Sequence, residues 1–401
     1  MTERVRTARA AGRRIISQSS GDPGIDTDPR IIEVAAKALH DGDTHYGPAA
    51  GALKLRDALA AREQLRTGAV YDPGDILITP GGKFALLTAL MGIVQEGDEV
   101  LVPEPGWVSY GPCVQMCGGR AVPLPMLDHI DVAQMQAAIT DRTVAIILNS
   151  PVNPTARVLT AAEIDAVVEL AERHNLWIVF DQVYSDLLHE GRFTAPQATL
   201  AGQARTLVVD SLSKTFGMTG WRLGSLASPA GTARSFQRFM QHSVYCVPGF
   251  VQQAGIAALG LFDEIVPSYR TRFRTRQTYV STRLNAETNI NCPLPDAGFY
   301  LFPKVDGDDV AICATWLAEL GVAALPGSSF GAAGTGHVRL SLTTSQADLE
   351  EAIDGFVRLA HLNGATARTA EASSRPPLSS RLWRHSLTPH GRRPHPTPSL
   401  R

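Results

Sequence analysis

The chain has 401 residues, of which 44% are hydrophobic and 19% are charged. This composition is typical of a globular protein with a large core and two domains. The formal net charge is only −2, which argues against a broad surface for nucleic acid or membrane, and no apolar run approaches a membrane span.

Helical patterns with readable starts occur from the N-terminal region onward. The pair Asp28-Pro29 predicts the start of a helix, because Asp caps helix N-termini and Pro fits the first turn. Gly82 precedes an apolar helix over residues 84–95, which a glycine terminates. Thr160 and Glu163 have the spacing of a capping box and predict the start of a further helix.

Short apolar runs rich in β-branched residues lie between these helices, as expected of strands that are covered on both faces. Strands alternating with helices predict an α/β domain with a mostly parallel central sheet flanked by helices. The expected strands are Ile76–Thr79, Glu99–Pro103, Val144–Asn149, Leu176–Asp181, Thr206–Asp210 and Leu223–Ser228.

The pattern changes at about Thr271, where a long polar helix begins. Strand-like segments around Tyr300 and over Val338–Ser341 follow it, and Ser345 caps a final helix that is expected to end at Gly364. This mixture predicts a smaller α+β domain. The expected division is an N-terminal segment that joins the small domain, a large domain, the small domain and a tail, covering residues 1–45, 46–270, 271–364 and 365–401.

The tail from Ala365 carries seven arginines against one acid, Glu371, and is rich in Pro, Ser and Thr. It lacks apolar periodicity, which predicts disorder. The few and scattered cysteines favour reduced thiols in the cytoplasm and no metal site. They are Cys113, Cys117, Cys246, Cys292 and Cys313.

Glycine-rich or aromatic turns follow two of the expected strands. Gly82 opens a helix directly after a strand, where backbone N–H groups can approach a phosphate. The dinucleotide fingerprint G-x-G-x-x-G is absent from the sequence, which disfavours a dehydrogenase. Trp107 follows the next strand and either lies on an aromatic ring or fills the core.

Two further strand ends carry polar side chains. Asp181 ends a buried strand, where it either caps a turn or keeps a pyridine nitrogen protonated. Tyr184, three residues later, could hydrogen-bond a phenolic oxygen. Pro154 holds Asn153 in an extended conformation, so that either a simple proline turn or a fixed amide results. The carboxyl ends of strands in an open α/β sheet are where ligands bind.

Lys214 follows a buried strand, an unusual place for an ammonium because burial is costly. It lies in a stretch with Ser211, Ser213 and Arg222. This arrangement suits a lysine that forms a Schiff base with an aldehyde cofactor beside groups that hold a phosphate. Together with the residues at the other strand ends, this stretch provides a group suited to each part of pyridoxal 5′-phosphate.

These motifs resemble those of the class I/II aminotransferases, which have fold type I and use pyridoxal phosphate. The likeness covers about residues 15–362, and the stretch with Lys214 is specific for the cofactor and the fold. The segments that carry the resemblance are Tyr46–Gly51, Ser150–Thr155, Asp181–Tyr184, Ser211–Gly224, Pro326–Gly331 and Val338–Ser341.

The resemblance implies a role for each matching residue. Lys214 would be the Schiff-base lysine and proton shuttle, Asp181 would pair with the ring nitrogen, and Asn153 and Tyr184 would bind the 3′-oxygen. Trp107 would stack on the ring. The phosphate would be surrounded by Gly82, Lys83, Ser211, Ser213 and Arg222.

The resemblance also implies substrates and a partner. Arg339 would take the α-carboxylate of an amino acid in a bidentate pair, and a 2-oxo acid would accept the amino group in a ping-pong cycle. Gly21 would lie beside the substrate. Tyr46 would reach the phosphate of a neighbouring subunit, which implies a homodimer with shared sites.

The segments with Lys83 and Trp107 resemble those of bacterial aspartate aminotransferases, in which the lysine contacts the distal carboxylate of acidic substrates. Ala156 stands where the family usually has glycine, the N-terminal arm looks short, and Phe84 adds apolar bulk. These three features depart from the aspartate subgroup and argue against acidic substrates, whereas the segments with Lys83 and Trp107 argue for them. On balance, acidic substrates are favoured. The alternatives are aromatic or other neutral amino acids in specialised metabolism, or a lyase, decarboxylase or oxidase with the same cofactor.

Overall fold

A computed structural model of the chain describes residues 2–374, with side chains described for residues 3–361. Of the predicted disordered tail, residues 365–401, only residues 365–374 are described, as part of the last helix, and residues 375–401 lie outside this range. Met1–Arg358 form one compact unit, and the described part of the second unit is the continuation of the last helix to Ser374. The predicted division of residues 1–364 into a large and a small domain stays a prediction.

The largest sheet in the described residues has seven strands, in the order β2-β8-β7-β6-β5-β3-β4. All its neighbouring strands are parallel except at β8, which runs antiparallel to both β2 and β7. This is the mostly parallel sheet that the sequence predicts. Its strands are β2 Ile76–Thr79, β3 Glu99–Glu104, β4 Arg120–Pro125, β5 Thr143–Asn149, β6 Trp177–Asp181, β7 Thr206–Ser211 and β8 Gly224–Ala227.

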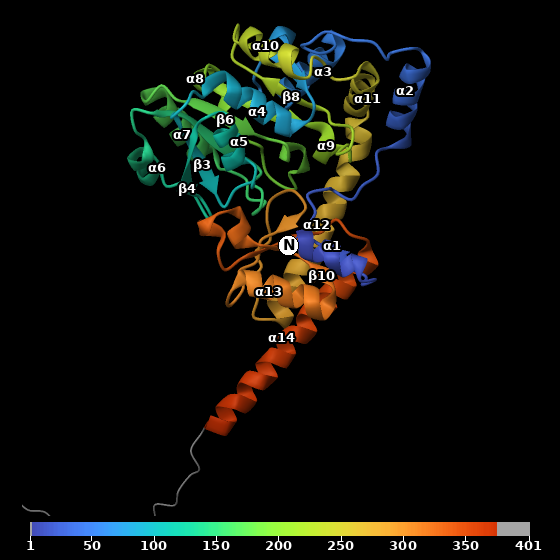
Figure 1. Ribbon diagram of the computed structural model, residues 1–401, viewed down its shortest axis with the longest axis vertical. Helices are drawn as coiled ribbons and strands as arrows, with labels where there is room; N and C mark the ends of the chain where they lie inside the picture. Colours follow the sequence, from blue (N-terminus) through green and yellow to red (C-terminus); the bar gives the residue numbers. More distant parts are fainter. Residues whose placement is uncertain (1, 375–401) are drawn as a thin grey trace, which may run out of the picture. The chain divides into compact units, whose positions relative to one another are not determined.

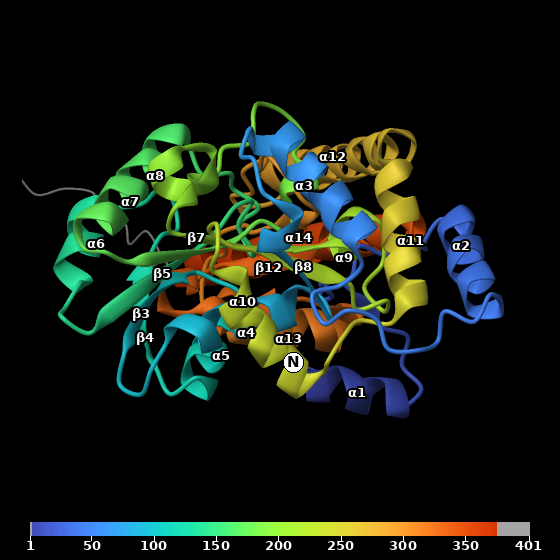
Figure 2. The ribbon, with the colours of Figure 1, turned by 90° about the horizontal axis from the view of Figure 1, so that it is seen from above.

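Helices cover both faces of this sheet (Figure 2). One face packs against α4, α5 and α10, and the other packs against α3, α6, α7 and α11. The helix α2 packs on α11. These helices and the four-residue helices of the same region are α2 Pro29–His40, α3 Leu53–Thr67, α4 Gly82–Ile93, α5 Tyr110–Met116, α6 Val132–Ala138, α7 Ala161–Arg173, α8 Leu200–Gln203, α9 Leu212–Thr215, α10 Ala233–Ser243 and α11 Gly249–Gly260.

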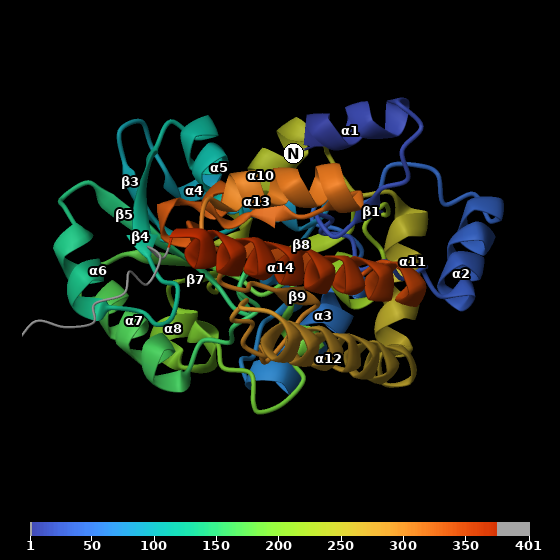
Figure 3. The same cartoon turned by 90° about the horizontal axis from the view of Figure 1, so that it is seen from below.

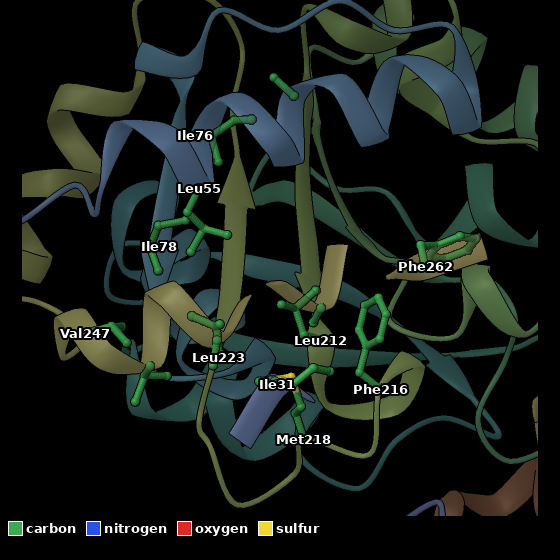
Figure 4. Packing of buried hydrophobic residues seen from close by; sticks show 14 of the residues in the cluster. Ile31, Leu55, Ile76, Ile78, Leu212, Phe216, Met218, Leu223, Val247 and Phe262 are labelled. Carbon is green, nitrogen blue, oxygen red and sulfur yellow. The ribbon is translucent and has the colours of Figure 1, made fainter. Parts of the chain in front are cut away.

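Alternate strand residues point to the two faces, which explains why the strands are apolar throughout. On β6, Val179 packs with α4 and α5, whereas Ile178 and Phe180 pack with α7 on the other face. Figure 4 shows a cluster on that second face, where Ile76 and Ile78 of β2 lie near Leu55 of α3.

The C-terminal part of the compact unit contains two small sheets, β11-β12-β9 and β1-β10 (Figure 1). The pairing of β1 with β10 is parallel and joins the N-terminal segment to this part of the chain. The elements are α1 Thr2–Ala10, β1 Ile16–Ser17, α12 Phe262–Glu287, β9 Tyr300–Leu301, α13 Asp309–Thr315, the π-helical η4 Trp316–Leu320, β10 Val322–Ala323, β11 Leu325–Pro326, β12 Val338–Ser341 and α14 Gln346–Ser374.

The first turns of α14 lie between α12 and the segment α13–η4 (Figure 3). Asp354 of α14 pairs with Arg283 of α12 at 2.9 Å, and Phe356 packs on Trp316 of η4 with ring centroids 4.0 Å apart. These contacts cross three elements and hold the helices around the small sheets.

The helix starts agree with the sequence patterns. Asp28 caps α2 through Arg30 N, and Thr160 with Glu163 forms the predicted capping box of α7. Gly364 was the expected end of the last helix, but it lies inside α14, which continues to Ser374. The alanines after Gly364 favour helix and outweigh a single glycine.

Within the part of the chain that the structure describes, none of the helices combines the length and apolar character that crossing a bilayer requires.

Candidate active site

A cavity of about 400 Å³ lies at the carboxyl ends of the parallel strands of the large sheet. Strand register brings the ends together, because Asn149 pairs with Asp181 and Ser211 pairs with Gly224. The predicted site residues that line the cavity are Gly21, Gly82, Lys83, Trp107, Asn153, Asp181, Tyr184, Ser211, Ser213, Lys214, Arg222 and Arg339.

Lys214 lies in the short helix α9, which follows directly after β7. Its Nζ donates to the carbonyl oxygen of Gly21 at 2.6 Å. Burial lowers the pKa of Lys214 to about 8, and the positive charges of Arg339 and Arg222 act in the same direction. A larger fraction of this amine is therefore neutral at physiological pH than in an ordinary lysine, as a nucleophile and proton carrier requires.

Asp181 is buried at the end of β6. Its Oδ2 accepts a hydrogen bond from the Tyr110 hydroxyl at 2.8 Å, and its Oδ1 accepts from Val183 N at 3.2 Å. Burial raises the pKa of Asp181 to about 6, while these two hydrogen bonds oppose the rise. A buried carboxylate of this kind gains from a cationic N–H partner on a bound molecule.

Arg339 on β12 is buried and points at the same cavity. Its Nη1 donates to Asn153 Oδ1 at 2.9 Å, and its Nη2 donates to Ser19 O at 2.8 Å. The guanidinium carbon lies 4.3 Å from the ring centre of Tyr300 and 5.0 Å from that of Phe330. Two aromatic faces and two oxygen acceptors thus fix this cation in the cavity wall.

The hydroxyl groups of Tyr184 and Tyr300 lie 3.0 Å apart, and both rings are buried. Burial raises the pKa of each phenol, so both are neutral at physiological pH. A hydrogen bond between neutral hydroxyls leaves one proton available to donate to a ligand oxygen.

A glycine turn forms one end of the cavity, at the N-terminus of α4. Gly81 has φ +82°, and a Cβ on it would lie 2.4 Å from Arg222 Nη2. A Cβ on Gly82 would lie 3.3 Å from the Cβ of Ser211. The backbone N–H groups of the first helical turn, two serine hydroxyls and a guanidinium converge there, which is a suitable cradle for a phosphate.

Lys83 and Trp107 form another part of the wall, with Lys83 Nζ 5.0 Å from the centre of the Trp107 ring. Val108 and Leu325 line the cavity as well. The wall thus contains a second cation and apolar surface, so that this region alone fits either a carboxylate or an apolar side chain.

Tyr46 is the predicted site residue that does not line the cavity of its own chain. It is 87% exposed and contacts Tyr245, with ring centroids 5.0 Å apart. An exposed position is what a residue that serves a neighbouring subunit requires.

The sequence reading missed Asn149, Tyr110 and Tyr300, which all line the cavity. Asn149 ends a predicted strand, so the strand-end argument that selected Asp181 could have found it. Its Nδ2 donates to Asp181 O, and its Oδ1 accepts from Asn153 N. Tyr110 and Tyr300 come from a helix and a short strand whose patterns carry no comparable signal.

The family model described as aminotransferase class I and II matches residues 13–356. An aspartate aminotransferase from Pyrococcus abyssi is 36% identical over 359 residues, which cover 86% of this chain and 92% of that protein. An aromatic-amino-acid aminotransferase from Thermococcus litoralis is 36% identical over 353 residues, covering 85% and 90%.

The solved structure of aspartate aminotransferase from Thermus thermophilus with maleate is also similar. Its TM-score is 0.84 at 33% identity, and the match covers 89% of this chain and 94% of that one. This chain therefore belongs to the class I and II aminotransferases, which are pyridoxal-phosphate-dependent enzymes that act on amino acids and 2-oxo acids.

Proposed function

We propose that the aminotransferase reaction of this protein takes place in the cavity around Lys214 and that aspartate- or glutamate-like amino acids are its preferred donors. The convergence of Lys214 and Arg339 on one short segment carries the proposal. Lys214 donates to Gly21 O, and Arg339 donates to Ser19 O two residues earlier. An amine with a lowered pKa and a carboxylate-binding cation thus share one wall.

The residues of the cavity fit pyridoxal phosphate. Gly81 has a positive φ and lies against the Arg222 guanidinium, and a Cβ on Gly82 would make a tight contact of 3.3 Å with Ser211, which is expected where a phosphate approaches backbone N–H groups. When bound, the cofactor supplies an aldehyde for the amino group and a ring that accepts the electron pair released at the substrate Cα.

The chain's own groups then have distinct tasks. Asp181 would hold a proton on the ring nitrogen, because its buried carboxylate is stabilised by a cationic partner. Asn153 would donate through its amide nitrogen to the 3′-oxygen, since its Oδ1 already accepts from Arg339. Tyr184 would donate to the same oxygen, and Trp107 would cover one face of the ring.

Lys214 would remove the proton from the substrate Cα and return it to the cofactor carbon. Its lowered pKa supports this role, because a base with a pKa of about 8 can both take and release a proton at physiological pH. Arg339 would bind the α-carboxylate and so orient the Cα–H bond toward Nζ. This positioning supplies much of the rate, because the transfer becomes intramolecular.

Two cations in one cavity support the acidic preference. Arg339 and Lys83 could each bind one carboxylate of a dicarboxylic substrate. The similar structure from Thermus thermophilus contains maleate, a dicarboxylate. Neutral or aromatic donors are the second candidate, favoured by the apolar lining at Val108, Leu325 and Phe330 and by the relative from Thermococcus litoralis.

A panel of amino donors with one fixed 2-oxo acid tests the proposal. Wild-type protein should use aspartate or glutamate with the highest kcat/KM. In Lys83→Met, kcat/KM for aspartate should fall roughly 30-fold, about 2 kcal/mol for a lost charged hydrogen bond, whereas the value for phenylalanine should change little.

Equal losses with both donors would place Lys83 at the phosphate instead, and faster turnover of neutral donors by wild type would select the second candidate. Absorbance follows the conversion of the bound cofactor to its amine form. If no amino acid produces this conversion, the reaction assigned to this cavity is contradicted.

We also propose a homodimer with shared sites and a cytoplasmic location. Exposed Tyr46 and Tyr245 support the dimer, because large aromatic side chains that are exposed together mark interaction surfaces. The free thiols of the five cysteines support a reducing compartment.

A further inference from the structure

A cluster of charged side chains is buried beside the strand ends that carry the cavity residues. We call it the charged cluster; its members are Arg62, Glu63 and Arg66 of α3, Asp186 of η2 (Ser185–Leu187) and Asp210 of β7. The side chains of Glu63, Arg66 and Asp186 are each less than a tenth exposed. None of the five lines the cavity.

The cluster is joined by ion pairs and amide hydrogen bonds. Arg66 Nη1 lies 2.9 Å from Asp210 Oδ2, and Arg62 pairs with Asp186. Gln182 Nε2 donates to Glu63 Oε2 at 2.8 Å and to Asp210 Oδ2 at 3.3 Å. Every carboxylate thus has at least one cationic or amide partner. The Nε atoms of Arg62 and Arg66 are buried without a hydrogen-bond partner among the described residues.

On β6 and the turn after it, the cluster binds the sequence neighbours of two cavity residues. Gln182 follows Asp181 and donates to Glu63 and Asp210. Ser185 follows Tyr184, and its hydroxyl accepts from Arg66. Neighbouring residues share a rigid, planar peptide unit, so a contact that holds one of them restricts the position of the next.

The same relation holds on β7 and α9. Asp210 precedes Ser211 and accepts from its backbone N at 2.7 Å. Thr215 follows Lys214, and its hydroxyl donates to Asp186 Oδ2 at 3.2 Å. The two segments that carry the predicted lysine, ring-nitrogen partner and phosphate serine are therefore connected through one polar network.

Stability alone is a poor reason for such a cluster. Replacing a buried ion-pair network by apolar residues of similar volume often leaves a protein as stable or more stable. Here burial raises the pKa of Asp210 to about 6, although the Arg66 charge opposes the rise, which shows that its ionised form is held at a cost. In return, charged hydrogen bonds have narrow geometry and hold the strand ends in one arrangement.

We propose that the charged cluster is a positioning device for the aminotransferase reaction, which aims Asp181, Tyr184, Ser211 and Lys214 by fixing the residues next to them. The inference rests on the proposed location of the reaction in the Lys214 cavity. It predicts that disturbing the charged cluster lowers kcat and shifts the pH midpoint of the cofactor absorbance. A loss of thermal stability alone would produce neither change.

The test compares Asp186→Asn and Asp210→Asn with Glu99→Gln as a matched control. Glu99 is a fully buried carboxylate paired with Arg120 and Arg142. It begins β3 and so lies at the amino ends of the parallel strands, whereas the cavity lies at their carboxyl ends. Each holoenzyme is measured for kcat and KM, for the pH midpoint of the cofactor absorbance, and for Tm.

In both cluster variants, kcat per bound cofactor should fall roughly 10- to 100-fold, as for a small misplacement of reacting groups, while KM changes less than about threefold. The absorbance midpoint should shift. The control should lose Tm to a similar extent but keep kcat and the midpoint. Cluster variants that lose Tm yet keep wild-type kcat and midpoint would overturn the inference.

A second pair of variants decides the question if those proteins do not fold. Thr215→Val removes the hydroxyl that reaches Asp186 and keeps the side-chain volume, whereas Thr215→Ser keeps the hydroxyl. The valine variant should show the same slower turnover and shifted midpoint, and the serine variant should restore both. A valine variant that equals wild type would overturn the inference.

Failure of the proposed function has a different signature. If the wild-type holoenzyme converts no amino donor, the reaction proposed for the Lys214 cavity is contradicted, whatever the variants show. The absorbance midpoint can still be measured in that case, and an unshifted midpoint in the cluster variants would overturn the positioning role independently.

Discussion

The surroundings of Lys214 set the pKa of its side-chain amine. Burial brings its pKa to about 8, whereas an unperturbed lysine titrates near 10.4. At pH 8 about half of the Lys214 amines are therefore neutral, compared with less than about 1% for an ordinary exposed lysine. A neutral amine, which the proposed nucleophilic role requires, is thus available without an additional base.

This difference predicts the reactivity of the apoprotein. With a trace of an acylating reagent, labelling of Lys214 should rise steeply between pH 7 and 9 and then level off, because the neutral amine is the reactive form. Mass spectrometry of the labelled peptides follows each lysine separately, and Lys54, which is exposed on α3, is the reference.

Labelling of Lys214 that tracks the reference up to pH 10 would contradict the lowered pKa. Arg339→Leu provides a second check, because removal of that positive charge should move the Lys214 midpoint upward.

At the same scale, sequence and structure differ in an instructive way. Asp181, Lys214 and Arg339 stand in motifs where strand ends and family resemblance both apply. Tyr110 was missed because it reaches Asp181 from a helix 71 residues earlier, and only the docking of α5 on the sheet creates that contact. No local pattern encodes a contact of this kind.

At the scale of elements, six of the seven strands of the large sheet follow from apolar runs. The strand β4 was missed, because its prolines Pro123 and Pro125 and its exposed positions break the pattern of a buried strand. Prolines are tolerated there since β4 is the edge strand. The antiparallel direction of β8 was also beyond the sequence, because an apolar run carries no sign of direction.

The start of β8 is pressed against the glycine turn of the cavity. A Cβ on Gly224 would lie 2.5 Å from Gly81 C and 2.6 Å from Gly82 N, both backbone atoms that cannot rotate away. Gly224→Ala should therefore displace the turn, destabilise the protein by about 1–3 kcal/mol and weaken pyridoxal phosphate binding at least about tenfold.

Absorbance titration of the apoprotein with pyridoxal phosphate measures the binding, and thermal unfolding measures the stability. Gly260→Ala is the control, because a Cβ there meets nothing within 4 Å. Wild-type affinity in Gly224→Ala would contradict the cradle proposed at this turn.

At the scale of the whole molecule, a dimer with shared sites predicts that two inactive variants can restore activity to each other. If Tyr46 of one subunit completes the site that contains Lys214 of the other, then Lys214→Ala and Tyr46→Ala should each be nearly inactive alone. Mixed dimers carry both defects in one site and none in the other. Each mixed dimer should therefore have about half of the wild-type activity, because one of its two sites is intact.

Differently tagged subunits allow the mixed dimers to be purified and assayed. A control mixture of Lys214→Ala with Asp181→Ala should give no recovery, because both residues line the cavity of the same chain. Inactivity of the purified Lys214→Ala and Tyr46→Ala mixture would argue against shared sites.

The hydrogen bond between Arg339 and Ser19 joins residues 320 positions apart. At roughly 5–20 residues per second, the ribosome delivers the first of them roughly 15 to 60 seconds before the second. Lys214 and the glycine turn are already made in that interval, so a growing chain can present its lysine before its arginine exists. Binding of the substrate α-carboxylate, the role proposed for Arg339, is thus acquired late in the synthesis of this protein.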